Sequence, residues 1–226
     1  MKLLQRLGCL ARVGRVAREM RRAVAAGPAR WVVLDVESSG LDATRDRLLA
    51  IAAIGVRVDG PRARIVLGDS FEVVLRQDVS VPDAANILLH GIGVGAQRSG
   101  GAPGPALAEF EHYIGTSPLV AFHAAFDRTL ILRACNALLG RAPANPWLDL
   151  EPLAAVLHPQ TPARSLDEWM AALHITCAAR HQAAADTLAT AELLLKLWPA
   201  VLRETKGGTG FAAVRELAGR RKWLQR

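Results

Sequence analysis

The sequence predicts one α/β domain built on a mixed β-sheet. Three long strand-like segments follow one another in the first third of the chain, and helical segments then alternate with short apolar strands. A chain of 226 residues, 51% of them apolar, is long enough and apolar enough to bury a sizeable core. No internal repeat is evident.

Strand-forming patterns account for the sheet. The first segment is apolar almost throughout, as expected for a strand that is covered on both faces. The turn signal at residues 59–61 separates the second from the third, so the first three strands are expected to form an antiparallel meander. The five predicted strands are 31–37, 48–58, 63–75, 119–122 and 147–150.

Helical periodicity fills the remainder of the domain. The predicted helices are 105–114, 127–139, 151–157, 166–173 and 183–198. The glycine-rich stretch 91–104 is predicted to be a loop. It lacks the Gly-Lys-Ser/Thr sequence of a phosphate-binding Walker loop, and no strand precedes its glycines in the manner of a dinucleotide-binding fingerprint.

Both ends of the chain are basic. Residues 1–30 hold eight Lys/Arg against one Glu and predict an amphipathic helical extension, whereas residues 203–226 hold seven Lys/Arg against two acids. We therefore expect an extension over 1–30, a domain over 31–200, and a basic, helical C-terminal tail over 201–226. The net acidic middle suggests a cation-binding centre between segments that attract polyanions, although solvated helices explain the same charges equally well.

The compartment is indicated by the cysteines and the hydropathy. Cys9, Cys135 and Cys177 are odd in number and have no Cys-x-x-Cys spacing, which argues against a disulfide framework or a zinc-thiolate site. The longest apolar runs are too short to cross a bilayer, so a soluble, cytoplasmic protein is expected. No convincing signal peptide opens the chain; an arginine-rich transit peptide is an alternative, although the stretch has no serine.

Two carboxylates stand at the end of the first predicted strand. Side chains alternate along a strand, so Asp35 and Glu37 point to the same side while Val36 points away. Like charges this close repel unless a cation or a shared proton lies between them. The pair is therefore a candidate metal site or acid/base dyad; the alternative is that both cap the strand in solvent.

Three further residues extend this candidate site. Asp127 follows a strand at the start of a helix, where an N-cap explains it when it is taken alone. His181 precedes Asp186 by five residues, which turns a helix by about 140°, so the two would not share a helical face. We expect His181 on a loop entering the helix and Asp186 on its first turns, although an exposed loop histidine explains His181 alone.

In this order and context, the chain resembles the DEDDh 3′-to-5′ exonucleases, the family of the proofreading epsilon subunit of bacterial DNA polymerase III. The three motifs are VVLDVESSGLDATRDRLLAIAAIGV, VAFHAAFD and HQAAADTLATAELLL, and ILLHGIG and SLDEWMAALHI resemble two connecting elements. The resemblance spans about residues 31–198. It departs at Ser38 and Ser39, where the family commonly has Thr-Thr, and at Phe122 and His123, where it commonly has His-Asn.

The resemblance implies a fold, a cofactor and a set of roles. The fold would be a ribonuclease H-like mixed five-stranded sheet flanked by helices. The metal ligands would be Asp35, Glu37, Asp127 and Asp186, holding two divalent cations, Mg²⁺ or Mn²⁺, with Asp35 shared between them, and His181 would be the general base. The substrate-binding residues would be Ser38, Ser39, Gly40, Leu41, His90 and Phe126.

The same resemblance implies release of nucleoside 5′-monophosphates from single-stranded or frayed 3′ ends, with DNA favoured over RNA in proofreading or repair. A DNA polymerase subunit is a possible partner. Three alternatives stay open: an RNA-trimming relative similar to RNase T or oligoribonuclease, a non-catalytic accessory protein that binds a polymerase or nucleic acid, and a small-molecule metallohydrolase.

Overall fold

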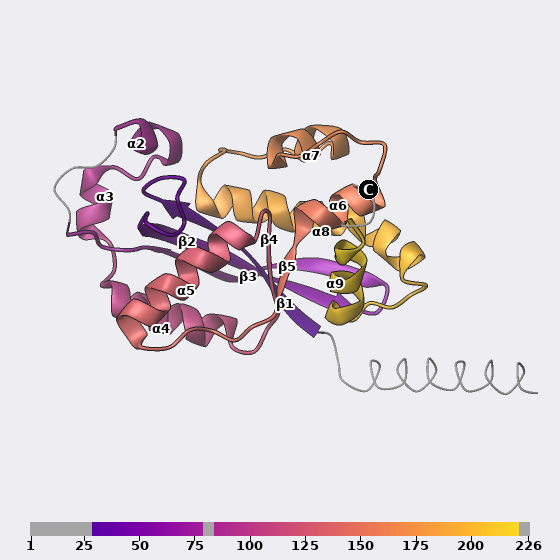
Figure 1. The fold of residues 1–226 in the computed structure, drawn as a ribbon, viewed down its shortest axis with the longest axis horizontal. Coiled ribbons are helices and arrows are strands. Elements are labelled where there is room, and N and C mark those ends of the chain that lie inside the picture. Colours follow the sequence, from indigo (N-terminus) through magenta and orange to yellow (C-terminus); the bar gives the residue numbers. More distant parts are fainter. Residues whose placement is uncertain (1–28, 79–83, 222–226) are drawn as a thin grey trace, which may run out of the picture.

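The computed structural model describes residues 29–78 and 84–221. Its centre is a five-stranded mixed sheet in the order β3-β2-β1-β4-β5, with helices on both faces (Figure 1). The predicted mixed sheet flanked by helices is thus confirmed. The predicted extension over 1–30 lies outside the described residues except for its last two, which begin β1.

The strands combine an antiparallel meander with two parallel additions. β1 pairs with β2 and β2 with β3 in antiparallel fashion, whereas β4 is parallel to β1 and β5 to β4. The carboxyl ends of β1, β4 and β5 therefore meet at one edge of the sheet. The strand bounds are Ala29–Ser38 (β1), Leu48–Asp59 (β2), Arg62–Val74 (β3), Leu119–Ala121 (β4) and Trp147–Asp149 (β5).

The described residues form eight helices: the five predicted ones in the predicted order, two earlier ones that were not predicted, and one in the C-terminal segment predicted to be helical. Their bounds are Ala84–His90 (α2), Val94–Ser99 (α3), Pro103–Ile114 (α4), Ala125–Leu139 (α5), Leu150–Leu157 (α6), Leu166–Leu173 (α7), Ala183–Glu204 (α8) and Phe211–Gly219 (α9). Within residues 29–78 and 84–221, none of them is long and apolar enough to cross a membrane.

The stretch 91–104 differs from the prediction of a loop, because it contains α3 and the start of α4. The only buried side chain of α3 is Gln97, whose amide donates to the Ile92 carbonyl at 3.0 Å. A helix that buries a polar side chain gives no apolar periodicity to detect. α4 begins at Pro103, which a first helical turn accepts because that turn leaves N–H groups unpaired.

α8 is longer than predicted, since it continues past Trp198 and through Pro199 to Glu204. Ala200 and Val201 are buried, and this packing keeps the helix going where proline usually ends one. The segment predicted as a basic, helical tail thus begins inside α8 and also contains α9, which buries Val214 and Leu217.

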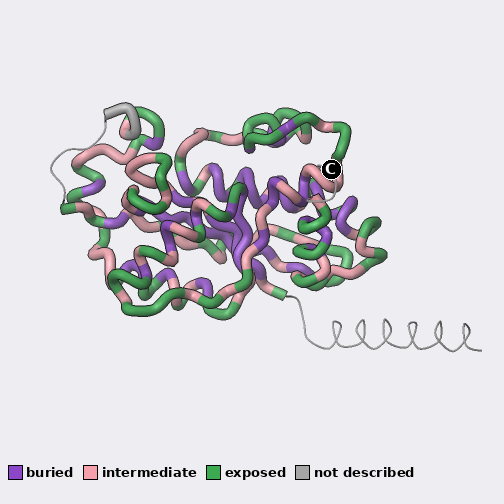
Figure 2. The backbone as a smooth tube through the Cα atoms, viewed as in Figure 1, coloured by how far each residue is buried: buried purple, intermediate pink, exposed green. Residues whose placement is uncertain are grey.

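Two apolar cores lie on the two faces of the sheet. Trp31 and Val33 of β1 face α6, α7, α8 and α9, whereas Val32 and Leu34 face α4 and α5. Figure 2 shows the buried residues concentrated along the central strands, with exposed residues on the outer helices and loops. The alternation of β1 thereby decides which helices its two carboxylates will meet.

Trp31 joins β1 to the last two helices. Its ring is 1% exposed and makes edge-on contacts with Trp198 of α8 and Phe211 of α9, at centroid distances of 5.6 and 5.0 Å. Such aromatic pairs stabilise beyond the area that they bury. α9 is held to the domain through this cluster.

We expect Trp31→Ala to lower the free energy of unfolding by about 3–5 kcal/mol, because it removes a large side chain from a packed core. Urea unfolding measures the change. Leu67→Ala is the matched control: its side chain is 71% exposed, so the loss should stay within about 0.5 kcal/mol. Equal losses in the two variants would contradict the role assigned to Trp31.

Candidate active site

The site begins where the apolar side of β1 ends. Asp35 and Glu37 continue the face that carries Trp31 and Val33, so they point toward the α8 side of the sheet. Their register partners on β2 are Ala52 and Ala50. These small neighbours leave space above the strand for the two carboxylates and for whatever neutralises them.

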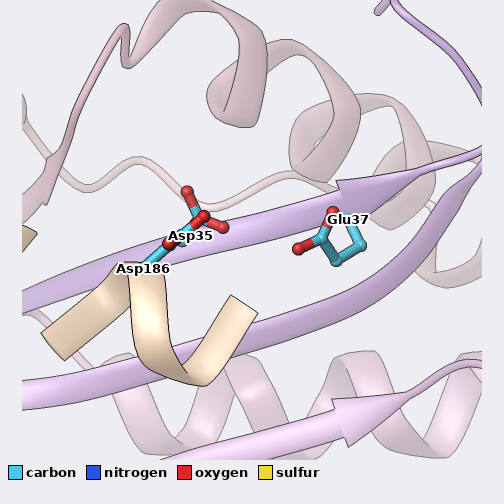
Figure 3. Close-up of side chains that lie close together, drawn as sticks. All are labelled: Asp35, Glu37 and Asp186. Atoms are coloured by element: carbon cyan, nitrogen blue, oxygen red, sulfur yellow. The ribbon is translucent and has the colours of Figure 1, made fainter. Parts of the chain in front are cut away.

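α8 brings the third carboxylate to this place. The buried hydroxyl of Thr187 donates to the Ala52 carbonyl at 3.1 Å, and Ala52 lies opposite Asp35. Asp186, one residue earlier on the helix, is thereby set over the end of β1. Carboxylate oxygens of Asp35, Glu37 and Asp186 all lie within 4.8 Å of one another (Figure 3).

Asp127 lies in the first turn of α5, a different helix from the one that carries Asp186, and is 4% exposed. It does not belong to the group of three, but its charge raises the pKa of Asp35. Burial raises the pKa of Asp127 to about 7, the charge of Asp149 adds to this, and the amides of Asp127 and Val36 oppose it by hydrogen bonding. The fourth carboxylate is therefore buried beside the cluster.

Burial and mutual repulsion make the cluster a poor place for negative charge. Burial raises the pKa of Asp35 well above its usual range, and the charges of Asp127, Glu37 and Asp186 raise it further. Burial likewise raises the pKa of Glu37 to about 8, with Asp186 contributing. Near neutral pH these carboxylates must hold protons or lie beside a cation.

One cation already lies at the cluster. The Arg180 guanidinium pairs with Asp186 and also with Asp167 of α7, and its charge lowers the pKa of both Asp35 and Glu37. The sequence analysis missed Arg180. It stands beside His181 in the chain, but its acidic partners come from α7 and α8, a contact that no local pattern reveals.

His181 lies in the turn before α8, and Gln182 is the N-cap residue of that helix. The predicted placement, a loop histidine entering a helix that carries Asp186, is what the structure shows. The backbone of His181 has φ 61°, and its amide donates to Asp186 Oδ2 at 3.0 Å. Its imidazole does not belong to the three-carboxylate group.

The family model described as Exonuclease (RNase_T) matches residues 32–194, which contain the whole cluster. The chain belongs to this exonuclease family. It is 37% identical over 191 residues to a DNA polymerase III subunit epsilon-like protein of Rhodobacter capsulatus, covering 81% of this chain and 25% of that protein. It is 30% identical over 167 residues to a DNA polymerase III PolC-type of Clostridium perfringens, covering 73% and 11%.

These relatives are longer proteins: the chain spans about a quarter of the first and a ninth of the second. Among solved structures, E. coli exonuclease I in complex with a dT13 oligonucleotide superposes with a TM-score of 0.66 at 19% identity, covering 82% of this chain and 45% of that chain. At this identity the likeness shows the fold, which is the ribonuclease H-like exonuclease fold implied by the sequence motifs.

The end of β1 and the loop that follows it carry four predicted substrate-binding residues. Ser39 Oγ donates to Asp46 at 3.0 Å and accepts from the Arg47 amide, while Ser38 Oγ donates to the Gly40 carbonyl. A Cβ on Gly40 would lie 2.5 Å from the Asp46 carboxylate, so a larger residue here would have to displace that side chain from its hydrogen bond with Ser39. These contacts hold the segment from Ser38 to Arg47 in place. Leu41 within it is 90% exposed.

The remaining two predicted substrate-binding residues lie on helices. His90 ends α2 and is 4% exposed; its Nδ1 accepts from the Ile92 amide at 3.0 Å, and burial lowers the pKa of the imidazole. Phe126, half-buried, immediately precedes Asp127 and packs against the core under α4 and α5.

Asp149 is a second residue that the sequence analysis missed. It ends β5, where its carboxylate accepts from the amides of His123 and Glu151 at 3.0 and 3.1 Å. His123, where the family commonly has asparagine, has φ 56°, a backbone region in which asparagine and histidine are both enriched. Asp149 therefore holds the turn that leads to Asp127. An aspartate between a short strand and a helix is an N-cap signal that could have revealed it.

The donor set fits hard divalent cations. The three grouped side chains offer carboxylate oxygens and no sulfur or imidazole nitrogen, which suits Mg²⁺, Mn²⁺ or Ca²⁺ better than Zn²⁺. Bound cations would also remove the repulsion that helps to raise the pKa of Asp35 and of Glu37. The residues present thus fit the metal dependence that the family motifs imply.

The raised pKa values predict how pH acts on the metal-free protein. Between about pH 5 and pH 8 the folded state binds more protons at Glu37 than the unfolded state does, so stability falls as pH rises. We expect the melting temperature of the wild type to fall relative to that of Glu37→Gln across this window. Calorimetry at several pH values measures the difference.

With saturating Mn²⁺, the melting temperature of the wild type should fall less with pH relative to that of Glu37→Gln. The reason is that the metal binds the deprotonated carboxylates of the folded state. A wild-type protein that gains stability relative to Glu37→Gln between about pH 5 and pH 8 would contradict the electrostatic account of the cluster.

Proposed function

We propose that the protein is a metal-dependent 3′-to-5′ exonuclease that removes nucleoside 5′-monophosphates from single-stranded or frayed 3′ ends of DNA. The observation that carries the proposal is the cluster of Asp35, Glu37 and Asp186 within 4.8 Å, with Asp127 buried beside it. These are the four carboxylates of the family motifs.

Asp35, Glu37, Asp127 and Asp186 would hold two divalent cations. The charges of the other three carboxylates all act on Asp35, which supports a shared role for it. When bound, such cations supply the positive charge that lowers the pKa of water and stabilises the developing charge on phosphate oxygens. The protein contributes the rigid placement: two ligands on β1, one on α8 and one on α5.

His181 is proposed as the general base. It takes a proton from the water that attacks the terminal phosphodiester, the bond from phosphorus to the 3′-oxygen breaks, and the last nucleotide leaves with its 5′-phosphate. The hydrogen bond from its amide to Asp186 supports this role, because it ties the turn that carries the imidazole to the cluster.

The proposed substrate is a single strand. A terminal nucleotide must be unpaired to enter a recessed site, and the exposed Leu41 on the loop after β1 offers an apolar surface for its base. DNA is favoured over RNA because the relatives carry DNA polymerase III names and the matched exonuclease I structure contains a dT13 oligonucleotide. The same names support a proofreading or repair role and a DNA polymerase as partner.

Digestion of matched 5′-labelled DNA and RNA single strands tests the proposal. With Mn²⁺ or Mg²⁺ the wild type should give a ladder that shortens from the 3′ end, faster on DNA. Asp35→Asn keeps the side-chain shape but removes a shared ligand, so it should be close to inactive, as should the wild type with chelator. Asp78→Asn, which changes a carboxylate 94% exposed, is the matched control and should remain active.

Each outcome of this experiment decides between functions. Faster digestion of RNA would replace the DNA proposal with the exoribonuclease. Intact DNA and RNA with either metal would overturn the exonuclease and favour a non-catalytic binding protein or a small-molecule hydrolase.

The role of His181 has its own test. The residue has φ 61°, which alanine adopts poorly, so His181→Asn is the better variant: asparagine tolerates this backbone and lacks the base. We expect turnover to fall about 10²- to 10⁴-fold with metal binding retained. His112→Ala, on the exposed side of α4, should leave turnover unchanged. Wild-type turnover in His181→Asn would remove His181 from the mechanism.

A further inference from the structure

Arg180 makes an unusual pair of contacts for a residue so close to a metal-binding cluster. Its side chain is 24% exposed and lies between Asp186, which is 8% exposed, and Asp167 on α7, which is 58% exposed. One partner belongs to the cluster and the other does not. The guanidinium thus bridges the cluster to a helix that carries none of its ligands.

The two edges of the guanidinium are used differently. Nε and Nη2 lie 2.5 and 3.3 Å from the two carboxylate oxygens of Asp167, a two-pronged pair. Nη1 is buried and pairs with Asp186 Oδ1, and, against the lowering effect of burial, both the hydrogen bond and the charge of Asp186 raise the pKa of the guanidinium. The contact with Asp167 thus uses two donors of the side chain, whereas the contact with Asp186 uses one.

We propose that Arg180 is the built-in counter-cation of the metal site: it neutralises Asp186 when no metal is bound and competes with the divalent cations for that carboxylate. The inference rests on the metal dependence in the proposed function and adds a residue that sets metal affinity. On metal binding, Nη1 gives up Asp186 while the two-pronged pair with Asp167 keeps the guanidinium in place.

The physical reason is the repulsion among the carboxylates. Asp35, Glu37 and Asp186 share one small volume, and an arginine at its border lowers the electrostatic cost of keeping them together without metal. The same positive charge opposes a divalent cation at the same carboxylate. Removing it should destabilise the metal-free protein and strengthen metal binding, two effects of opposite sign.

A purely structural clamp makes a different prediction. If Arg180 served only to fasten α7 to the start of α8, its loss would loosen Asp186 and weaken metal binding. The sign of the change in metal affinity therefore separates the two roles.

The experiment is a Mn²⁺ titration of the full chain without nucleic acid, with free Mn²⁺ followed by electron paramagnetic resonance. Arg180→Gln should bind Mn²⁺ about three- to tenfold more tightly than the wild type, as expected for loss of a competing partly buried ion pair. Its melting temperature should be below that of the wild type without metal, and the gap should narrow at saturating Mn²⁺.

Arg128→Gln is the matched control. Arg128 directly follows Asp127 in the chain, but within the described residues it forms no ion pair, so its loss should change Mn²⁺ affinity less than the loss of Arg180. An equal gain in both variants would mean that any nearby arginine acts through its general field, and it would overturn the specific role.

Asp167→Asn gives a second test, which stays valid if Arg180→Gln fails to fold. It removes the anchor on α7, leaves Asp186 as the remaining ion-pair partner of Arg180 within the described residues, and should weaken Mn²⁺ binding. Adding Asp167→Asn to Arg180→Gln should not weaken Mn²⁺ binding further, because the effect of Asp167 on metal affinity acts through the arginine.

Unchanged or weaker Mn²⁺ binding by Arg180→Gln, or unchanged binding by Asp167→Asn, overturns the inference. If the wild type still binds Mn²⁺ and digests DNA, the proposed function survives that failure. A wild type that binds no Mn²⁺ overturns both.

Discussion

Repulsion between carboxylates that are shielded from water is the constraint on which this site depends. Asp35 and Glu37 share a face because a strand has a period of two, and α8 adds Asp186 to the same volume. Burial raises the pKa of the first two, so the arrangement stores an unfavourable charge distribution at neutral pH. The cluster is therefore suited to cations, because bound positive charge would relieve the repulsion that the fold imposes.

The scaffold holds these groups with hydrogen bonds from outside the cluster. Thr187 fixes the first turn of α8 to β2, and Asp149 fixes the turn that leads to α5. Arg133 of α5 donates to the Asp46 carbonyl at 2.7 Å and so fastens the loop after β1. Each of these contacts joins elements far apart in sequence, so the positions of the ligands are set by tertiary packing and not by local turns alone.

What the sequence could predict follows from the range of the interactions concerned. The strands and the Asp35/Glu37 pair were predictable because alternation is local, and the order of the three motifs indicated the family before any coordinate was known. α3 was not predictable from the sequence, since it buries a glutamine and has no apolar stripe. The role of Arg180 was not predictable either, because it depends on where α7 lies relative to α8. No short segment of the sequence specifies that position.

The turn before α8 contains two adjacent residues with proposed roles, Arg180 and His181. His181 adopts φ 61°, and this reversal of the chain lets its amide reach Asp186 while the preceding Arg180 reaches the same carboxylate from its side chain. The proposed base and the proposed counter-cation therefore meet at one ligand. Asp186 accepts a hydrogen bond from the backbone of one residue and pairs with the side chain of the residue before it. The two proposed roles therefore depend on the placement of the same carboxylate.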